Sequence, residues 1–141
     1  MFVFIIDIIY IMEKRGKSFG YSLHLNLYDC LGSIECFRKP GKDKDNGALI
    51  LKIFVDYVLS LIDMKPIYEP LVKYYGDHDW NKGYSYLQLI NTSNINIHTV
   101  SSTKSVYIDI FSCRQFDVEK VRSYCKVFWI PSEMNYDFLE R

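Results

Sequence analysis

The chain has 141 residues, of which 49% are hydrophobic, and it carries 17 Lys and Arg against 17 Asp and Glu. This length and apolar content suit one domain with a sizeable core. A net charge of zero provides no field that would attract nucleic acid or an anionic membrane surface, so neither partner is expected. The four cysteines show neither metal-ligand spacing nor the density of a secreted disulfide scaffold, which favours reduced thiols in the cytoplasm.

Residues 1–19 are interpreted as an N-terminal extension. Their apolar run, residues 2–11, is shorter than the ~20 residues of a membrane helix and is interrupted by Asp7. It also lacks the basic leader and the cleavage site of a signal peptide. The run is either an extra edge strand or a translated upstream segment with Met12 as the true start, and we favour the second.

Hydrophobic periodicity in the rest of the chain predicts strands and two helices. The strands are expected at residues 21–28, 83–91, 94–99, 106–113 and 126–130, with an extended segment at 65–75, and the helices at 48–63 and 117–126. Two prolines in the segment 65–75 suit an edge strand or a bulge better than a central strand. This order, written βαβββαβ, predicts an α+β two-layer sandwich with an antiparallel sheet and two helices on one face. The domain is expected to cover residues 20–131, followed by a C-terminal tail, 132–141.

Three polar side chains, Asn94, Asn96 and His98, alternate with isoleucines, which is the period of a strand with one apolar and one polar face. The polar residues 101–104 predict a turn into the next strand, which ends at Cys113. A hairpin would place His98 and Cys113 on neighbouring strands. An imidazole and a thiol form a pair that can move protons near neutral pH. We therefore expect a chemical site carried by these strands.

The stretch 92–99 resembles the motif Glu-Ser-His-x-x-x-His-Thr of the small prokaryotic S-adenosylmethionine decarboxylases, pyruvoyl enzymes made as proenzymes that cleave themselves before the serine. By this resemblance, Ser93 is the serine that becomes the pyruvoyl group, and His98 is the processing histidine five residues later. Cys113 is similarly the catalytic cysteine, and Ser85 the second processing serine. The resemblance covers about residues 20–129.

The chain also departs from the family pattern. Thr92 stands where the family has glutamate before the cleaved bond, and Asn94 where it usually has histidine. Residues 100–102 read Val-Ser-Ser where the family usually has Trp-Pro-Glu, whose glutamate holds the ribose hydroxyls of the substrate. Asn26 replaces an acidic residue of the first strand. These departures leave both the cleavage between Thr92 and Ser93 and the exact substrate open.

Two further residues are considered for substrate binding. Trp80 is the nearest match to the family's aromatic residue that stacks on adenine, although a partly buried structural Trp is an equal alternative. Glu69 is a possible carboxylate for substrate, although a solvated Glu is the commoner case. His78 with Asp77 and Asp79 could mimic a metal cluster, but no further ligand lies nearby in the sequence, so no metal site is expected.

The resemblance implies an enzyme, a carbon–carbon lyase that decarboxylates S-adenosylmethionine for spermidine and other polyamine synthesis. In that mechanism the pyruvoyl carbonyl forms a Schiff base with the substrate amine and accepts electrons as carbon dioxide leaves, and Cys113 returns a proton. Ser85 and His98 serve the earlier self-processing. The family forms homodimers with shared active sites, so a cytoplasmic homo-oligomer, with a dimer favoured, is expected.

Three alternatives remain at this stage. The first is an uncleaved lyase that releases methylthioadenosine from S-adenosylmethionine or a conjugate, which the missing glutamate before Ser93 favours. The second is a pyruvoyl decarboxylase of ornithine or arginine, which the lost ribose acceptor favours. The third is a non-enzymatic homologue that binds a ligand and predicts an intact chain without turnover.

Overall fold

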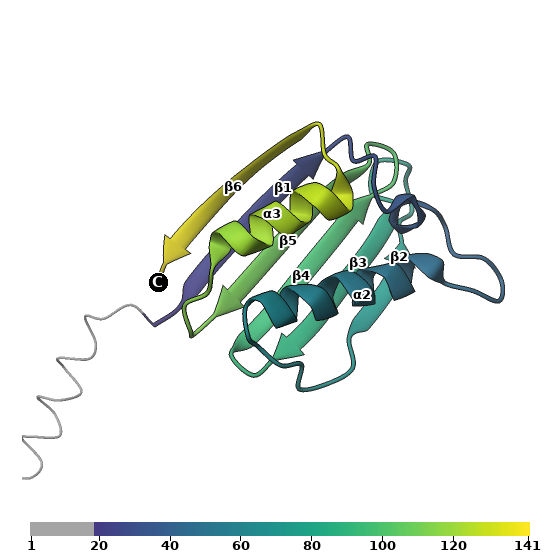
Figure 1. The fold of residues 1–141 in the computed structure, drawn as a ribbon. Coiled ribbons are helices and arrows are strands. Elements are labelled where there is room, and N and C mark those ends of the chain that lie inside the picture. Colours follow the sequence, from purple (N-terminus) through teal and green to yellow (C-terminus); the bar gives the residue numbers. More distant parts are fainter. Residues whose placement is uncertain (1–18) are drawn as a thin grey trace, which may run out of the picture.

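The computed structural model describes residues 19–141, which form a six-stranded sheet and two helices (Figure 1). The predictions made for the preceding segment, including the choice of Met12 as the start, concern residues outside this described part. The elements run in the order β1 (Tyr21–Tyr28), η1 (Ile34–Phe37), α2 (Asn46–Leu61), β2 (Leu71–Tyr75), β3 (Gly83–Ile90), β4 (Ser93–Val100), β5 (Ser105–Ser112), α3 (Val118–Trp129) and β6 (Glu133–Glu140).

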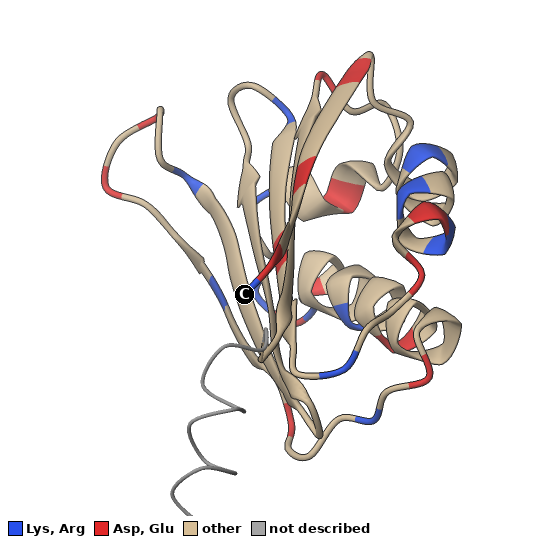
Figure 2. Cartoon of the chain, turned by 90° about the vertical axis from the view of Figure 1, so that its left-hand side faces the viewer, with Lys and Arg blue, Asp and Glu red and all other residues tan. Residues whose placement is uncertain are grey.

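The sheet has the strand order β2-β3-β4-β5-β1-β6, and all of its pairs are antiparallel. Figure 2 shows the sheet on edge, with both helices on one side and the opposite face uncovered by the described residues. This arrangement confirms the predicted α+β two-layer sandwich. It also confirms that the proline-containing segment forms an edge strand, because β2 lies at one end of the sheet.

The alternation of apolar and polar residues decides which face of each strand is buried. The leucines of β1, Leu23, Leu25 and Leu27, are fully buried beneath the helices, whereas His24 between them is exposed on the open face. The helices begin where the sequence provides caps. Asp117 accepts the N–H of Lys120 at 3.2 Å and so caps α3, as predicted.

The prediction for the C-terminal part of the chain was wrong in two respects. Residues 126–130 were expected to form the last strand, but α3 continues to Trp129 and ends at Ile130, which has a left-handed φ of 47°. Residues 132–141 were expected to form a tail, but they contain β6, which pairs with β1 along its whole length. The domain therefore continues to the end of β6. Along the chain, four strands lie between α2 and α3, whereas the pattern βαβββαβ has three.

Packing explains both errors. Val127, Phe128 and Ile130 favour strands intrinsically, but burying Trp129 completely against Phe37 and Phe54 requires the helical stripe to continue. In the true last strand, β6, every second residue is apolar and lies on the helix side of the sheet: Met134, Tyr136 and Phe138. The period of two that is typical of a strand was therefore present in the sequence.

One buried polar side chain, Thr99, holds the C-terminal end of β4 in place. Its hydroxyl is fully buried, accepts the N–H of Tyr84 at 2.9 Å and donates to the carbonyl of Cys36 at 2.9 Å. Thr99 thereby joins β4 to β3 and to η1, next to His98. Gly83 allows this close approach, because a Cβ there would collide with the Thr99 carbonyl oxygen.

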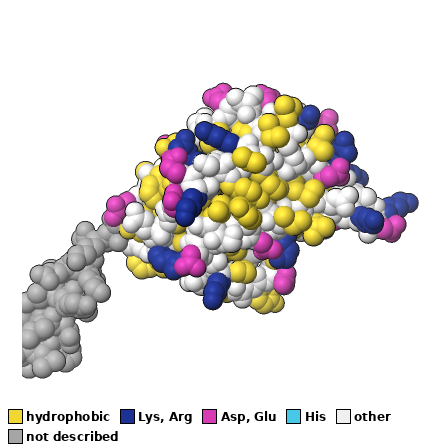
Figure 3. Space-filling model, in the orientation of Figure 1, with side chains coloured by type: hydrophobic (Ala, Val, Ile, Leu, Met, Phe, Trp, Pro, Cys, Tyr) yellow, Lys and Arg dark blue, Asp and Glu magenta, His cyan; other side chains and the backbone are white. Residues whose placement is uncertain are grey.

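The outer surface of the helices carries exposed apolar side chains, visible as a yellow area in Figure 3. Leu49, Ile53 and Tyr57 of α2 are each more than half exposed, and Val127 of α3 is more exposed still. Helix α2 is thus apolar on its buried side and along a second stripe that faces outwards.

The contacts of Thr99 lead to a stability prediction. Replacing Thr99 with Val removes both hydrogen bonds and leaves a buried N–H and a buried carbonyl unpaired, which is expected to lower the free energy of unfolding by about 1–3 kcal/mol. Chemical denaturation measures this loss. The control Thr103→Val changes the same group in an exposed turn and is expected to stay within about 0.5 kcal/mol of wild type. Equal stability of the two variants would contradict the role of Thr99.

Candidate functional site

The bond predicted to be cleaved, between Thr92 and Ser93, lies at a tight turn. Ile90 pairs with Ser93, so only Asn91 and Thr92 connect β3 to β4. Ser93 in turn pairs with Ser112 at the end of β5. This register brings the residue after β5, Cys113, beside the turn, and the N–H of Cys113 donates to the Thr92 carbonyl at 3.0 Å. The carbonyl that Ser93 would attack is therefore already polarised by a backbone donor.

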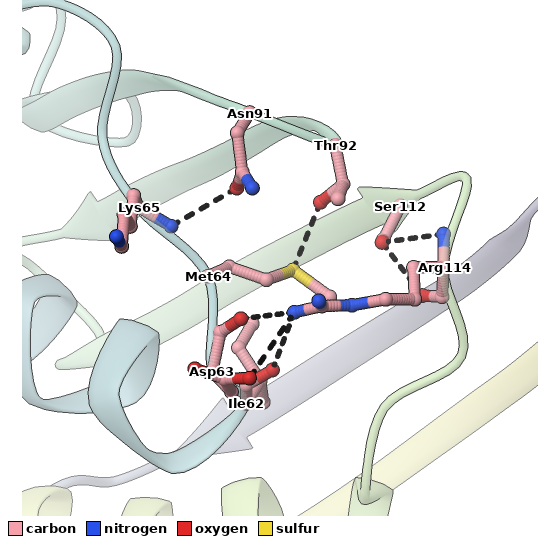
Figure 4. A network of polar contacts seen from close by, with 8 residues as sticks. All are labelled: Ile62, Asp63, Met64, Lys65, Asn91, Thr92, Ser112 and Arg114. Atoms are coloured by element: carbon pink, nitrogen blue, oxygen red, sulfur yellow. Dashed lines mark hydrogen bonds and ion pairs between the residues drawn. The ribbon is translucent and has the colours of Figure 1, made fainter.

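The end of α2 holds this turn in place (Figure 4). The Thr92 hydroxyl donates to the sulfur of Met64 at 2.9 Å. Asn91 accepts the N–H of Lys65 at its side-chain oxygen, at 3.0 Å, and donates its own N–H to the Lys65 carbonyl at 2.9 Å. Met64 and Lys65, which follow α2 shortly after its C-cap, thus hold the two residues of the turn in place.

Arg114 ties the same region to β5. Its guanidinium donates to the carbonyls of Asp63 and Ile62, at the C-terminal end of α2, where cations are favoured by the helix dipole. Its backbone N–H donates to the Ser112 hydroxyl at 3.0 Å, and that hydroxyl donates back to the Arg114 carbonyl at 2.6 Å. The backbone around Cys113 is consequently held from both sides.

A second group lies on the open face of the sheet. Ser85 and His98 are paired residues of β3 and β4, and the Ser85 hydroxyl lies 3.1 Å from Nδ1 of His98. They line a hollow of about 380 Å³ together with Lys73, Tyr107 and Asp109. A hydroxyl hydrogen-bonded to an imidazole is an arrangement suited to proton transfer.

The two groups stand at opposite ends of β4. Ser93 and His98 are five residues apart, a distance of roughly 16 Å along a strand. Their side chains also point to opposite faces, because odd spacing reverses direction in a strand. His98 lies within β4 and Cys113 directly follows the neighbouring strand β5, but His98 pairs with Tyr107 and not with the end of β5. Within one chain, Ser85 and His98 do not meet Ser93.

The two predicted substrate-binding residues belong to neither group. Trp80 lies in the loop between β2 and β3, is 72% exposed, and stacks on His78 with ring centroids 6.0 Å apart. Glu69 is exposed before the other end of β2 and does not line the hollow. A role for either residue in substrate binding stays a prediction.

Sequence reasoning missed four contributors to the turn: Asn91, Met64, Ser112 and Arg114. Only Arg114 gave a signal, as a cation directly after the candidate cysteine. The other three are recognisable only once α2, β3 and β5 are placed side by side.

Residues 19–141 contain no helix that is long and apolar enough to span a membrane. They also contain no group of three or more His, Cys, Asp or Glu side chains that could hold a metal ion.

The cysteines divide by exposure. Cys30, Cys36 and Cys125 are buried, and Cys113 is exposed. Burial, with a smaller contribution from Asp29, raises the pKa of the Cys30 thiol to about 11. Burial raises the pKa of the Cys36 and Cys125 thiols to about 12. Because the thiolate is the reactive form, these three side chains are chemically quiet at neutral pH.

The sequence matches the family model described as S-adenosylmethionine decarboxylase over residues 35–141. No curated protein matches the sequence of the chain. Among solved structures, the fold is similar to the crystal structure of the adenosylmethionine decarboxylase from Aquifex aeolicus VF5, with a TM-score of 0.65 and 16% sequence identity. The match covers 89% of this chain and 92% of that one.

The difference in exposure predicts selective labelling. In the folded protein at about pH 8, a thiol reagent is expected to modify Cys113 quickly and the other three cysteines only on unfolding. Intact mass spectrometry counts the modified thiols. The variant Cys113→Ser should lose the fast reaction and still show three thiols in denaturant. Rapid modification of more than one thiol in the native protein would contradict the burial of Cys30, Cys36 and Cys125.

Proposed function

Because the chain belongs to the S-adenosylmethionine decarboxylase family, we propose that it cleaves itself between Thr92 and Ser93 and decarboxylates S-adenosylmethionine, as a step in polyamine synthesis. The observation that carries the proposal is the hydrogen bond from the Cys113 N–H to the Thr92 carbonyl, at 3.0 Å. It places a fixed donor on the carbonyl that must be attacked, and it places the candidate catalytic cysteine beside the same bond.

The cleavage begins at Ser93. Its hydroxyl oxygen attacks the Thr92 carbonyl carbon, the C–N bond breaks, and the peptide becomes an ester with a free amine on Ser93. The negative charge that develops on the Thr92 oxygen is stabilised by the Cys113 N–H, in the manner of an oxyanion hole. The tight turn and the contacts of Met64 and Arg114 hold these atoms without further reorganisation.

The ester is then opened by elimination. A base removes the α-proton of Ser93, the bond from its side-chain carbon to the ester oxygen breaks, and Thr92 leaves with a carboxylate. Addition of water and loss of ammonia from the new terminus leave a pyruvoyl group at position 93. This group would supply the electron sink for decarboxylation. The exposed Cys113 thiol would hold the proton that returns to the substrate's α-carbon.

The base in this scheme is His98, assisted by Ser85, and both must come from a second copy. Within one chain they lie roughly 16 Å along β4 from Ser93. The open face of the sheet offers a way to join them, because two such faces can pack about 10 Å apart in a sandwich. A two-fold axis between the faces would bring each copy's His98 towards the backbone of the other copy's Ser93, where the α-proton lies, while the Ser93 side chain points to the helix side.

The composition of the open face supports such an assembly. It exposes the apolar side chains of Leu71, Leu89 and Leu139, on β2, β3 and β6 respectively, which are between 45% and 70% exposed in the isolated chain. Burying apolar side chains against a second copy is favourable by about 25 cal/mol per Å² of apolar surface. The dimer with shared sites that the family resemblance implies therefore has a physical driving force here.

The cleavage can be tested by the mass of the purified protein under denaturing conditions. We expect two fragments, one ending at Thr92 and one beginning with a pyruvoyl group, and a single uncut chain for Ser93→Ala. Ser102→Ala, in the exposed turn after β4, is the matched control and should be cut as wild type is. An uncut wild-type chain would refute the pyruvoyl mechanism.

The shared site can be tested by mixing two inactive chains. Ser93→Ala and His98→Ala are each expected to stay uncut when expressed alone. When they are expressed together, the His98→Ala chain should be cleaved, because its partner supplies an intact His98. The mass of the C-terminal fragment identifies its origin by the alanine at position 98. Cleavage of His98→Ala alone, or no cleavage in the mixture, would show that processing does not use the partner's histidine.

A further inference from the structure

The open face carries a hydrogen-bonded pair of titratable side chains that the proposed chemistry does not use. Nδ1 of His24 on β1 lies 2.7 Å from a carboxylate oxygen of Asp109 on β5. Both side chains are about half exposed, at 46% and 54%. We propose that this pair lies at the two-fold axis of the dimer, where His24 offsets part of the negative charge at the centre of the interface. The inference rests on the two-copy site of the proposed function.

The position of the axis follows from the positions of Ser93 and His98. When two sheets face each other across a two-fold axis, the axis lies between them and parallel to both. To carry His98 of one copy to Ser93 of the other, it must cross β4 at right angles, halfway between these two residues. The row of open-face residues nearest to this halfway line contains Asn96.

The sheet register identifies the rest of that row. Asn96 pairs with Asp109, Asp109 pairs with His24, and His24 pairs with Asp137 of β6. Residues of this row face their own counterparts in the second copy, because they lie beside the axis. Asp109 thus approaches the Asp109 of the other chain, and Asp137 approaches the other Asp137.

Such a row of carboxylates needs compensation. Two like charges repel more strongly once water is displaced from between the sheets. Protonated His24 lies between Asp109 and Asp137 and reduces the charge of each row from −2 to −1 when both carboxylates are ionised. The other titratable or charged groups of the open face are Lys73 and Tyr75 on β2, His98 on β4, Tyr107 on β5, Tyr28 on β1, Glu133 on β6, and Arg141, whose guanidinium lies over Phe111. None of these belongs to the row beside the axis.

The direction of the pH dependence follows from the same charges. When the His24 ring is protonated, it pairs with Asp109 and the dimer is favoured. When the ring is neutral, the carboxylates face each other uncompensated. The dimer therefore takes up protons when it forms, and its dissociation constant rises with pH. In the separate chain the pair is exposed and contributes little to stability, so its loss leaves the fold intact.

The test measures the dimer dissociation constant by sedimentation equilibrium, at about pH 6 and about pH 8. All proteins carry Ser93→Ala, so that differences in cleavage cannot affect the result. At about pH 6, His24→Gln is expected to raise the dissociation constant by about tenfold or more, because it leaves Asp109 without its cation. The double variant His24→Gln with Asp109→Asn should recover most of this loss and show little dependence on pH.

The matched control is His78→Gln, which removes an exposed histidine that lies 3.9 Å from Asp77 in the loop between β2 and β3. It should dimerise as the parent does. Thermal unfolding of each variant shows that the fold is retained. If the parent dimerises and His24→Gln dimerises equally well, the role of the pair is refuted while the shared site stands. If the parent is monomeric at both pH values, the two-copy site itself is refuted together with this inference.

Discussion

The register between β3, β4 and β5 is the constraint on which the rest of the site depends. The two-residue turn at Asn91 and Thr92 sets the pairing of Ile90 with Ser93, and this pairing fixes every later pair of the hairpin, including Ser85 with His98. A slip of one residue would reverse the faces of β4, exposing Ile95 and Ile97 and burying His98. The buried isoleucines and the Thr99 hydroxyl therefore hold Ser85 and His98 in their positions on the open face, although they lie on the other side of the sheet.

Much of this arrangement could be predicted from local sequence. The alternation in β1, β4 and β5 and the helical stripe of α2 each point to one structure, because the pattern agrees with the intrinsic preferences of the residues. The end of α3 could not be predicted in this way. Val127 and Phe128 favour a strand locally, and only the burial of Trp129 among aromatic side chains decides for the helix. The missed site residues are of the same kind, since Arg114 meets Asp63 across 51 positions of sequence.

Ser85 and His98 were predicted in the right strands, but the division of the family positions between two ends of β4 was not predicted. The sequence gives the order of Ser93, His98 and Cys113 along the chain, but it does not show which of them lie close together in the fold. The register separates them, with Thr92, Ser93 and Cys113 at one end and Ser85 and His98 at the other. The proposed mechanism therefore depends on a second copy, whose open face would supply the Ser85 and His98 that one chain keeps apart from Ser93.

Thr92, at the position where the family resemblance implies glutamate, fits its surroundings here. The side chain at this position points towards the thioether of Met64, a weak acceptor in a region closed by the end of α2. A hydroxyl can donate to sulfur, whereas a carboxylate has no proton to donate and would lose its hydration without gaining a cation. Arg114 does not provide that cation, because its guanidinium is already directed to the backbone carbonyls of Ile62 and Asp63. Thr92 is thus matched to Met64, and in the proposed cleavage the backbone N–H of Cys113 would be the donor that activates the Thr92 carbonyl.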